Sequence, residues 1–207
     1  MKIIIPGLFL IFFVASCATL VPFHSAPPDA RQWQQHQQNM VSISHWQLLG
    51  KLAMHNGHDG GQVDVFWQQQ DEQNYEIKLV APFGAGTTVV TAVPGQVMLA
   101  TSRGENITAD NIEQLLAQIP DWTFPVTGLR FWVLGIPSPQ STPGYMRWHE
   151  QGGLAVMEQD GWRIELENYA PSGNYYLPRK IFMRRVEKKK SQDDVELKLV
   201  IRQWTIP

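Results

Sequence analysis

Hydrophobic and polar residues alternate along most of this chain with a period of two. In the first such stretch, Trp46, Leu48 and Leu52 alternate with Gln47 and Lys51. Alternation of this kind is typical of a strand with one face in the core and one face in water. The stretches that show it are 46–55, 63–68, 75–79, 87–92, 96–101, 145–149, 154–159, 162–169, 179–187 and 195–205. Short turns rich in glycine separate several of them, so the pattern predicts an antiparallel meander.

A helical period replaces this alternation in the segments 30–41, 109–119 and 125–134. Asp29 is placed to cap the first of them, and Trp33 and Met40 give it only a narrow packing stripe, so we expect an outer brace. Thr108 is the expected cap of the second. The third is apolar nearly all round and ends at Gly135, which predicts a buried helix.

About ten strands with one apolar face, and two helices midway along the chain, predict an α+β fold that is mainly β. The simplest arrangement that buries the apolar face is a strongly curved antiparallel sheet, or incomplete β-barrel, whose helices form a lid over the concave side. Barrels of about eight strands can already hold one small ligand, so we expect an apolar cavity under this lid. We assign residues 29–207 to a single domain, because such a length suffices for one sizeable core.

The first residues have the layout of an export signal. One positive charge at Lys2 precedes an apolar run that is too short to span a bilayer comfortably, since a spanning helix takes about 20 apolar residues. The run ends in Val14-Ala15-Ser16-Cys17, which resembles the bacterial lipobox. In lipoproteins this cysteine is acylated and the signal peptide before it, here residues 1–16, is removed.

Cys17 has two interpretations: the acylated residue of a lipoprotein, or a buried cysteine that happens to follow a signal peptide. Since it is the only cysteine, it has no intramolecular disulfide partner in an oxidising compartment, which favours acylation. Three acyl chains exceed what stable anchoring requires. Ala18 follows where an aspartate would resemble an inner-membrane retention signal, so we expect an outer-membrane, lipid-anchored protein whose domain faces the periplasm. Residues 17–28 would form the lipidated end and a flexible tether.

Composition and missing motifs exclude several function classes. A net charge of -2 leaves no broad basic field for nucleic acid. The chain contains no GxxxxGK(S/T) loop for ATP and no GxSxG nucleophile elbow. His55, His58 and Asp59 share one glycine-rich turn, and a single loop of this kind rarely supplies three converging metal ligands. We therefore expect neither an enzyme nor a bound metal or cofactor.

Several further segments have a specific order and spacing along nearly the whole chain. They are Arg31–Gln38, Trp46–Ala53, Phe66–Gln69, Ala81–Gly84, Thr108–Asp110, Pro125–Pro137, Gly161-Trp162, Leu177-Pro178 and Trp204. Together with the lipobox they resemble the LolB family of outer-membrane lipoprotein receptors. The resemblance implies an incomplete barrel with a helical lid over an apolar cavity. It also implies a non-enzymatic receptor that accepts acylated lipoproteins from the periplasmic carrier LolA and delivers them, without ATP, to phospholipid of the inner leaflet of the outer membrane. We expect a monomer.

The connection Pro82-Phe83-Gly84 carries a bulky apolar residue in a tight turn. From the residues alone, Phe83 either folds back into the core or projects, and a tip in water should not carry phenylalanine unless it touches something apolar. The resemblance favours projection, although the family often has leucine here. It implies a membrane-insertion loop that dips into lipid or meets acyl chains during their release.

The resemblance further implies that apolar side chains of the concave face bind the acyl chains. The candidates are Trp46, Leu48, Val63, Val65, Trp67, Ile77, Leu79, Leu129, Trp132, Val133, Trp148, Trp162 and Ile164. From the residues alone, the tryptophans are ordinary core residues, and they line a cavity only if the barrel is hollow.

The basic cluster Arg184–Lys190 also has two interpretations. We favour a solvated hairpin tip that protects a sheet edge from aggregation over a contact with lipid phosphates or with an acidic patch on the carrier. Two other function classes stay open beside the receptor. One is an outer-membrane scaffold or interaction module. The other is a lipid-modifying enzyme, which is disfavoured because no nucleophile and base form a recognisable pair.

Overall fold

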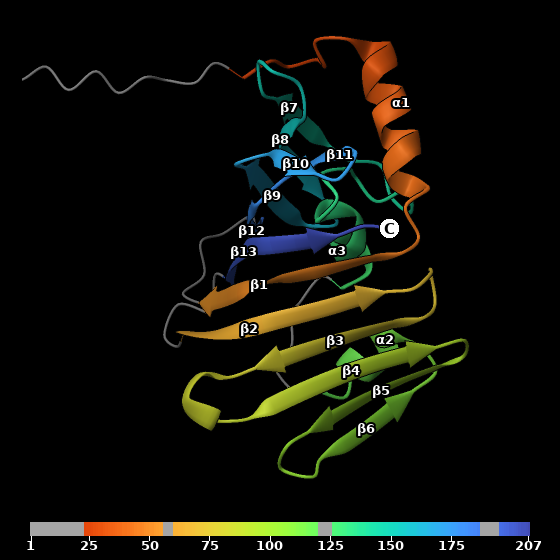
Figure 1. Ribbon diagram of the computed structural model, residues 1–207, viewed down its shortest axis with the longest axis vertical. Coiled ribbons are helices and arrows are strands. Elements are labelled where there is room, and N and C mark those ends of the chain that lie inside the picture. The colour runs from red at the N-terminus through yellow and green to blue at the C-terminus, as the bar shows by residue number, and fades with distance from the viewer. Residues whose placement is uncertain (1–22, 56–59, 120–125, 187–194) are drawn as a thin grey trace, which may run out of the picture.

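The computed structural model describes residues 23–55, 60–119, 126–186 and 195–207 (Figure 1). The predicted signal peptide, Cys17 and the first part of the tether lie outside these residues. His58, Asp59 and most of the basic cluster also lie outside them, whereas Arg184 and Arg185 are described and exposed at the end of a strand.

Eleven strands form one antiparallel sheet in the order β6-β5-β4-β3-β2-β1-β13-β12-β9-β8-β7, and a separate hairpin pairs β10 with β11. The strands are β1 (Trp46–His55), β2 (Gly60–Gln69), β3 (Tyr75–Val80), β4 (Thr87–Val93), β5 (Gln96–Thr101), β6 (Asn106–Ala109), β7 (Tyr145–Trp148), β8 (Leu154–Gln159), β9 (Trp162–Glu167), β10 (Ala170–Ser172), β11 (Tyr175–Leu177), β12 (Lys180–Arg185) and β13 (Glu196–Thr205). Within the described residues the outer strands β6 and β7 do not pair with each other, so the sheet stays open (Figure 1). The predicted fold, mainly β with an antiparallel sheet that does not close into a barrel, is confirmed.

The first and the last strand of this sheet along the chain, β1 and β13, lie side by side at its centre. Their register shifts between Leu49 and Gly50. A Cβ atom at Gly50 would lie only 2.6 Å from the carbonyl oxygen of Val200. The close approach of the two strands therefore requires glycine at this position of β1.

The described helices are α1 (Ala30–Val41), α2 (Ile112–Leu116) and α3 (Val126–Trp132), together with the short 3-10 helix η1 (Pro82–Gly84). α1 has the predicted bounds, and the Asp29 side chain caps it by accepting hydrogen bonds from the amides of Arg31 and Gln32. α3 ends two residues before the end of its predicted segment, 125–134, and residue 125 lies outside the described residues.

α2 is much shorter than the predicted helix 109–119, and Thr108 does not cap it. Thr108 and Ala109 instead belong to β6, where they pair with β5. The cap is Asn111, whose side chain accepts a hydrogen bond from the amide of Gln114. Pairing with a neighbouring strand has thus overridden a local capping signal.

Two hydrophobic clusters pack on the face of the sheet that carries α2 and α3, and each cluster contains one of these helices. We call this face the concave face. The larger cluster joins α3, through Trp132, to Leu48 and to residues of the β7–β13 half. The smaller cluster joins α2, through the fully buried Leu115, to Val90 of β4 and its neighbours. Ile77 of β3 borders both clusters. The helices therefore cover different parts of the sheet.

α1 braces the outside of the domain, as predicted. Met40 is its one buried residue. The Trp33 ring packs edge-on against Trp148 with centroids 5.9 Å apart and stacks on the His36 ring at 5.6 Å. Partial burial lowers the pKa of His36 below its ordinary value of 6.5. The Nε2 atom of His36 has no hydrogen-bond partner in the described structure, so nothing offsets the cost of charging this ring.

We expect His36 to make the folded protein less stable in acid. Because its pKa is lower in the folded chain than in the unfolded chain, the unfolded chain takes up the proton first as the pH falls. The contribution to stability is complete above pH 6.5 and is lost as the pH falls below it. Melting temperatures measured at neutral pH and at about pH 5 should therefore differ less for His36→Gln than for the wild type. His55→Gln, at an exposed position, is the control. Equal pH dependence of the wild type and His36→Gln would contradict this expectation.

Candidate functional site

Burial of the concave face decreases from one end of its strands to the other. Trp46 and Trp67 are buried at one end of β1 and β2, whereas Leu52 and Val63 are half-buried further along. Met54, near the other end, is 50% exposed. At this other end β1 stops, β2 begins and β3 leads into η1 (Figure 1). We call this end of the sheet the rim.

Four apolar residues of the concave face stay accessible near the rim: Leu52, Met54, Val63 and Leu79. We call them the rim-side residues. Leu52 and Met54 were not among the predicted acyl-binding residues. The period of two that places Trp46 and Leu48 on this face also places Leu52 and Met54 on it. The sequence pattern alone could therefore have identified Leu52 and Met54 as candidates.

η1 holds Phe83 outside the fold, at the rim. The backbone of Phe83 lies in the left-handed region with φ 56°, which is uncommon for a residue other than glycine, and Gly84 follows with φ 71°. The amide of Ala85 donates to the carbonyl oxygen of Pro82 at 3.1 Å and closes the turn. The Phe83 side chain is fully exposed, so the interpretation in which it folds back into the core is wrong. Its role in membrane insertion stays a prediction.

The predicted acyl-binding residues divide into two groups. Val63, Ile77 and Leu79 are half-buried. The others are buried in the cores: Trp46, Leu48, Val65, Trp67, Leu129, Trp132, Val133, Trp148, Trp162 and Ile164. Leu129 and Trp132 belong to α3 itself, and the other members of this second group pack with α3 in one buried cluster, so a ligand could reach them only if this cluster opened. Accessible apolar surface on the concave face thus lies toward the rim.

α3 and the segment that follows it are held by Gln159, which is 3% exposed at the end of β8. Its Oε1 accepts hydrogen bonds from Trp132 Nε1 at 2.8 Å and from the Ser138 amide at 2.9 Å. Its Nε2 donates to the carbonyl oxygens of Ser138 at 2.8 Å and Ser141 at 2.7 Å. One buried side chain therefore satisfies four polar groups and fixes the position of the Trp132 ring.

A second contact ties α3 to the β2–β3 turn. Arg130 Nη2 lies 3.1 Å from Glu72 Oε1, and Nη1 donates to the Glu72 carbonyl oxygen at 3.3 Å. The guanidinium also lies over the Phe131 ring, 4.4 Å from its centroid. Because the Glu72 side chain is largely exposed, this ion pair is the weaker tie. Of the two predicted lid helices, α3 is part of the core, whereas α2 buries only Leu115.

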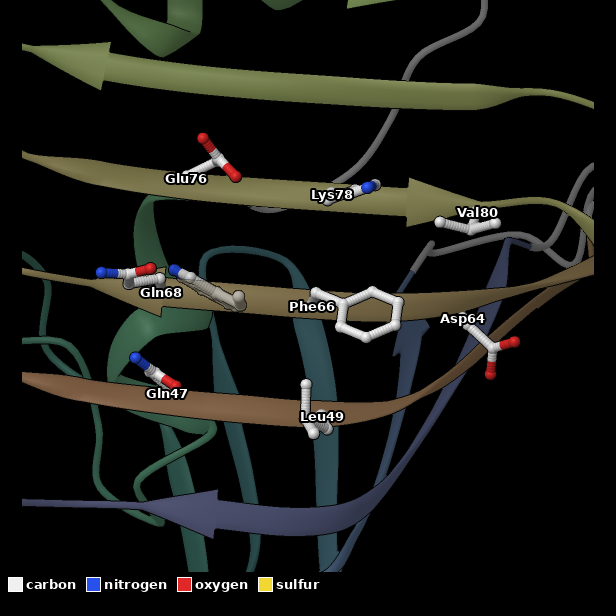
Figure 2. Close-up of a pocket in the computed structure, with 9 residues that line it drawn as sticks. Gln47, Leu49, Asp64, Phe66, Gln68, Glu76, Lys78 and Val80 are labelled. Carbon is white, nitrogen blue, oxygen red and sulfur yellow. The ribbon is translucent and has the colours of Figure 1, made fainter.

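The opposite face of the sheet, which we call the convex face, has a hollow of about 380 Å³ over β1, β2 and β3. Figure 2 shows Phe66 at its centre, between Leu49 of β1 and Lys78 of β3. Its other labelled residues are Gln47, Asp64, Gln68, Glu76 and Val80 (Figure 2). Asp64 is held by ion pairs with Lys51 and Arg202. The hollow lies on the face opposite to the rim-side residues and is ringed by polar groups, so it is not a candidate for burying acyl chains.

Among residues 23–55, 60–119, 126–186 and 195–207, no three His, Asp or Glu side chains gather closely enough to hold a metal ion. Over the same residues, none of the helices combines the length and the apolar character that crossing a membrane requires. The arrangement that the described structure offers is therefore an apolar surface beside an exposed aromatic side chain.

Comparisons with known proteins agree with one another. A family described as "Outer membrane lipoprotein LolB" matches residues 44–204. A protein named Outer-membrane lipoprotein LolB from Pseudomonas syringae pv. syringae is 32% identical over 197 residues, which cover 94% of this chain and 92% of that protein. One of the same name from Pseudomonas paraeruginosa is 34% identical over 176 residues, 85% of this chain and 82% of that protein. The crystal structure of a LolA superfamily protein from Nitrosomonas europaea is similar in fold, with a TM-score of 0.55 and 8% identity over 84% of this chain and 93% of that one.

Proposed function

Because this chain belongs to the LolB family of outer-membrane lipoproteins, we propose that it is a receptor that takes acylated lipoproteins from the periplasmic carrier LolA and passes them to the outer membrane. The family belongs to the lipoprotein localisation pathway and is not a known class of enzyme. To this family membership we add three proposed properties: the direction of transfer, the binding of acyl chains and the independence from ATP.

The observation that carries the proposal is the gradient of burial on the concave face. The rim-side residues Leu52, Val63 and Leu79 remain half-buried, and the fully exposed Phe83 lies at the same rim. Apolar side chains left accessible in one patch mark a binding surface for an apolar ligand. Acyl chains that reach this patch would lie beside a side chain suited to enter lipid.

Transfer through such a site needs no chemical energy source. Burial of acyl chains stabilises each complex by roughly 25 cal/mol per Å² of apolar surface. Directionality requires only that each acceptor hold the chains somewhat better than the donor before it. An open, shallow apolar surface fits a transient receptor better than a closed cavity does, because its cargo must also leave.

A lipid anchor would hold the domain at the membrane that receives the cargo. Acylated Cys17 would attach the protein to the outer membrane, with the domain in the periplasm and outer-membrane phospholipid as the final acceptor. We expect the domain to act as a monomer, in contact with the carrier and with one lipoprotein at a time.

The test is a transfer assay with the unlipidated domain, Ala18–Pro207. Carrier loaded with a labelled lipoprotein is mixed with this domain in the absence of ATP, the two are separated, and the label is followed. We expect the label to move to the domain. Label that stays on the carrier, while an established receptor removes it in parallel, would refute the proposal and leave the scaffold interpretation.

Two glutamate variants localise the binding surface. Leu79→Glu places a charge among the rim-side residues, and we expect it to reduce uptake of the label at least about tenfold, since a buried unpaired charge costs several kcal/mol. Phe66→Glu makes a comparable change on the convex face and should leave uptake unchanged. If both variants bound cargo like the wild type, the acyl chains would have to bind elsewhere.

A further inference from the structure

The segment before α1 is paired with the edge of the sheet. The His24 amide donates to the Trp148 carbonyl oxygen at 3.0 Å, and the Trp148 amide donates to the His24 carbonyl oxygen at 3.0 Å. Trp148 ends β7, which is one outer strand of the open sheet. This part of the predicted flexible tether thus continues the sheet by one residue pair.

Side chains strengthen the same contact. The Phe23 ring packs edge-on against the His149 ring with centroids 5.6 Å apart, and the His149 ring packs edge-on against Tyr169 at 5.8 Å. His149 Nε2 lies 2.8 Å from the carbonyl oxygen of Leu166, which fixes the ring. Trp148 is 3% exposed, so the partner of the segment is a rigid part of the core.

From these contacts we infer that Trp148 and His149 form a docking site for the chain's own anchor tether. We call the His24–Trp148 backbone pair and the Phe23–His149 ring contact the tether clasp. The inference deepens the proposed function, because it concerns how the anchored receptor is held at the membrane, and it assumes that Cys17 carries the lipid.

The chain between the clasp and α1 is suited to stay in place. Asp29 caps α1, so this chain is fixed at its other end as well. Pro27 and Pro28 lie between the two fixed points and restrict the backbone. Less conformational freedom is lost on docking such a chain than on docking a flexible one, so a single residue pair with one ring contact can hold it.

The clasp limits how far the anchor can lie from the domain. Six residue steps separate Cys17 from Phe23, and twelve separate it from Asp29. At about 3.3–3.6 Å per extended residue, the anchor can reach at most ~20 Å from the clasp, against ~40 Å if the chain were free up to α1. The clasp therefore keeps the β7 edge close to the lipid surface and narrows the range of orientations in which the rim can meet it.

The experiment uses the full lipidated protein in phospholipid vesicles. Since acylation consumes Cys17, the only cysteine, Gln151→Cys adds a single free thiol at an exposed position close to His149. A fluorophore on this thiol reports energy transfer to acceptor lipids. His24→Pro removes the amide donor to Trp148, and Phe23→Ala removes the ring contact. Ser25→Pro is the matched control, because the described structure gives Ser25 no hydrogen bond to β7.

We expect energy transfer to fall in the Phe23→Ala/His24→Pro double variant and to stay at the wild-type level in Ser25→Pro. Hydrogen exchange at the Trp148 amide should be at least tenfold faster in the double variant, in a domain that otherwise melts like the wild type. Unchanged energy transfer, or a Trp148 amide that exchanges equally fast in both proteins, would overturn the clasp. Neither readout depends on cargo. If the transfer assay failed while the Trp148 amide of the wild type stayed protected from hydrogen exchange, the receptor function would be refuted and the clasp would stand.

Discussion

Replacement of Gln159 by leucine is expected to lower the free energy of unfolding by about 3–5 kcal/mol. Leucine has a similar volume, so the loss comes from polar groups rather than from a cavity. The indole N–H of Trp132 and the amide of Ser138 would lose their acceptor in a buried site, and the carbonyl oxygens of Ser138 and Ser141 would lose their donor. Each buried group left without a partner costs about 1–3 kcal/mol.

Chemical denaturation followed by tryptophan fluorescence measures this loss. Gln62→Leu, at an exposed position of β2, is the matched control and should change stability by no more than about 0.5 kcal/mol. A loss below about 1 kcal/mol for Gln159→Leu would mean that water enters the site and replaces the side chain. In that case Gln159 would not be what holds α3.

Replacement of Phe83 by glutamate is expected to slow the release of lipoprotein into vesicles by roughly 10–100-fold, while uptake from the carrier continues. Burial of a phenylalanine side chain in an apolar environment contributes about 1.5–3 kcal/mol, and about 1.4 kcal/mol corresponds to a factor of ten. A charged side chain loses this contribution and resists entry into lipid. Because Phe83 is fully exposed and contributes nothing to the core, the variant should fold like the wild type.

The measurement is the rate at which a labelled lipoprotein moves from the loaded domain to vesicles. Phe83→Leu keeps an apolar tip and should retain most of the rate. Phe66→Glu places the same charge on the convex face and should retain all of it. Release at the wild-type rate by Phe83→Glu would end the case for an insertion loop.

Much of the architecture could be predicted from short-range patterns. The period of two placed the strands because each residue's side of the sheet depends only on its neighbours along the chain. α1 was predicted with its bounds because Asp29 and the helical spacing of Trp33 and Met40 are local signals. The boundary of α2 was missed because Thr108 and Ala109 pair with β5, a contact that the capping pattern does not report.

The candidate site was predictable only in outline. Alternation identifies the concave face, but the depth of each residue depends on what packs in front of it. No sequence pattern indicates that Gln159 accepts a hydrogen bond from Trp132 and holds it in the core. The pairing of His24 with Trp148 likewise joins residues far apart in the chain, where composition indicated only a tether. Non-local packing thus decides which apolar residues remain accessible.

The central position of β1 and β13 has a consequence for the order of folding. Each strand from β1 to β5 pairs with the next strand along the chain, and such local contacts form early. The other edge of β1 pairs only with β13, for example Leu48 with Trp204, near the end of the chain. Until those last residues are available, β1 is a temporary edge strand of ten residues, open to pairing with another chain. A polypeptide that is synthesised from its N-terminus must therefore keep this edge of β1 unpaired until β13 arrives.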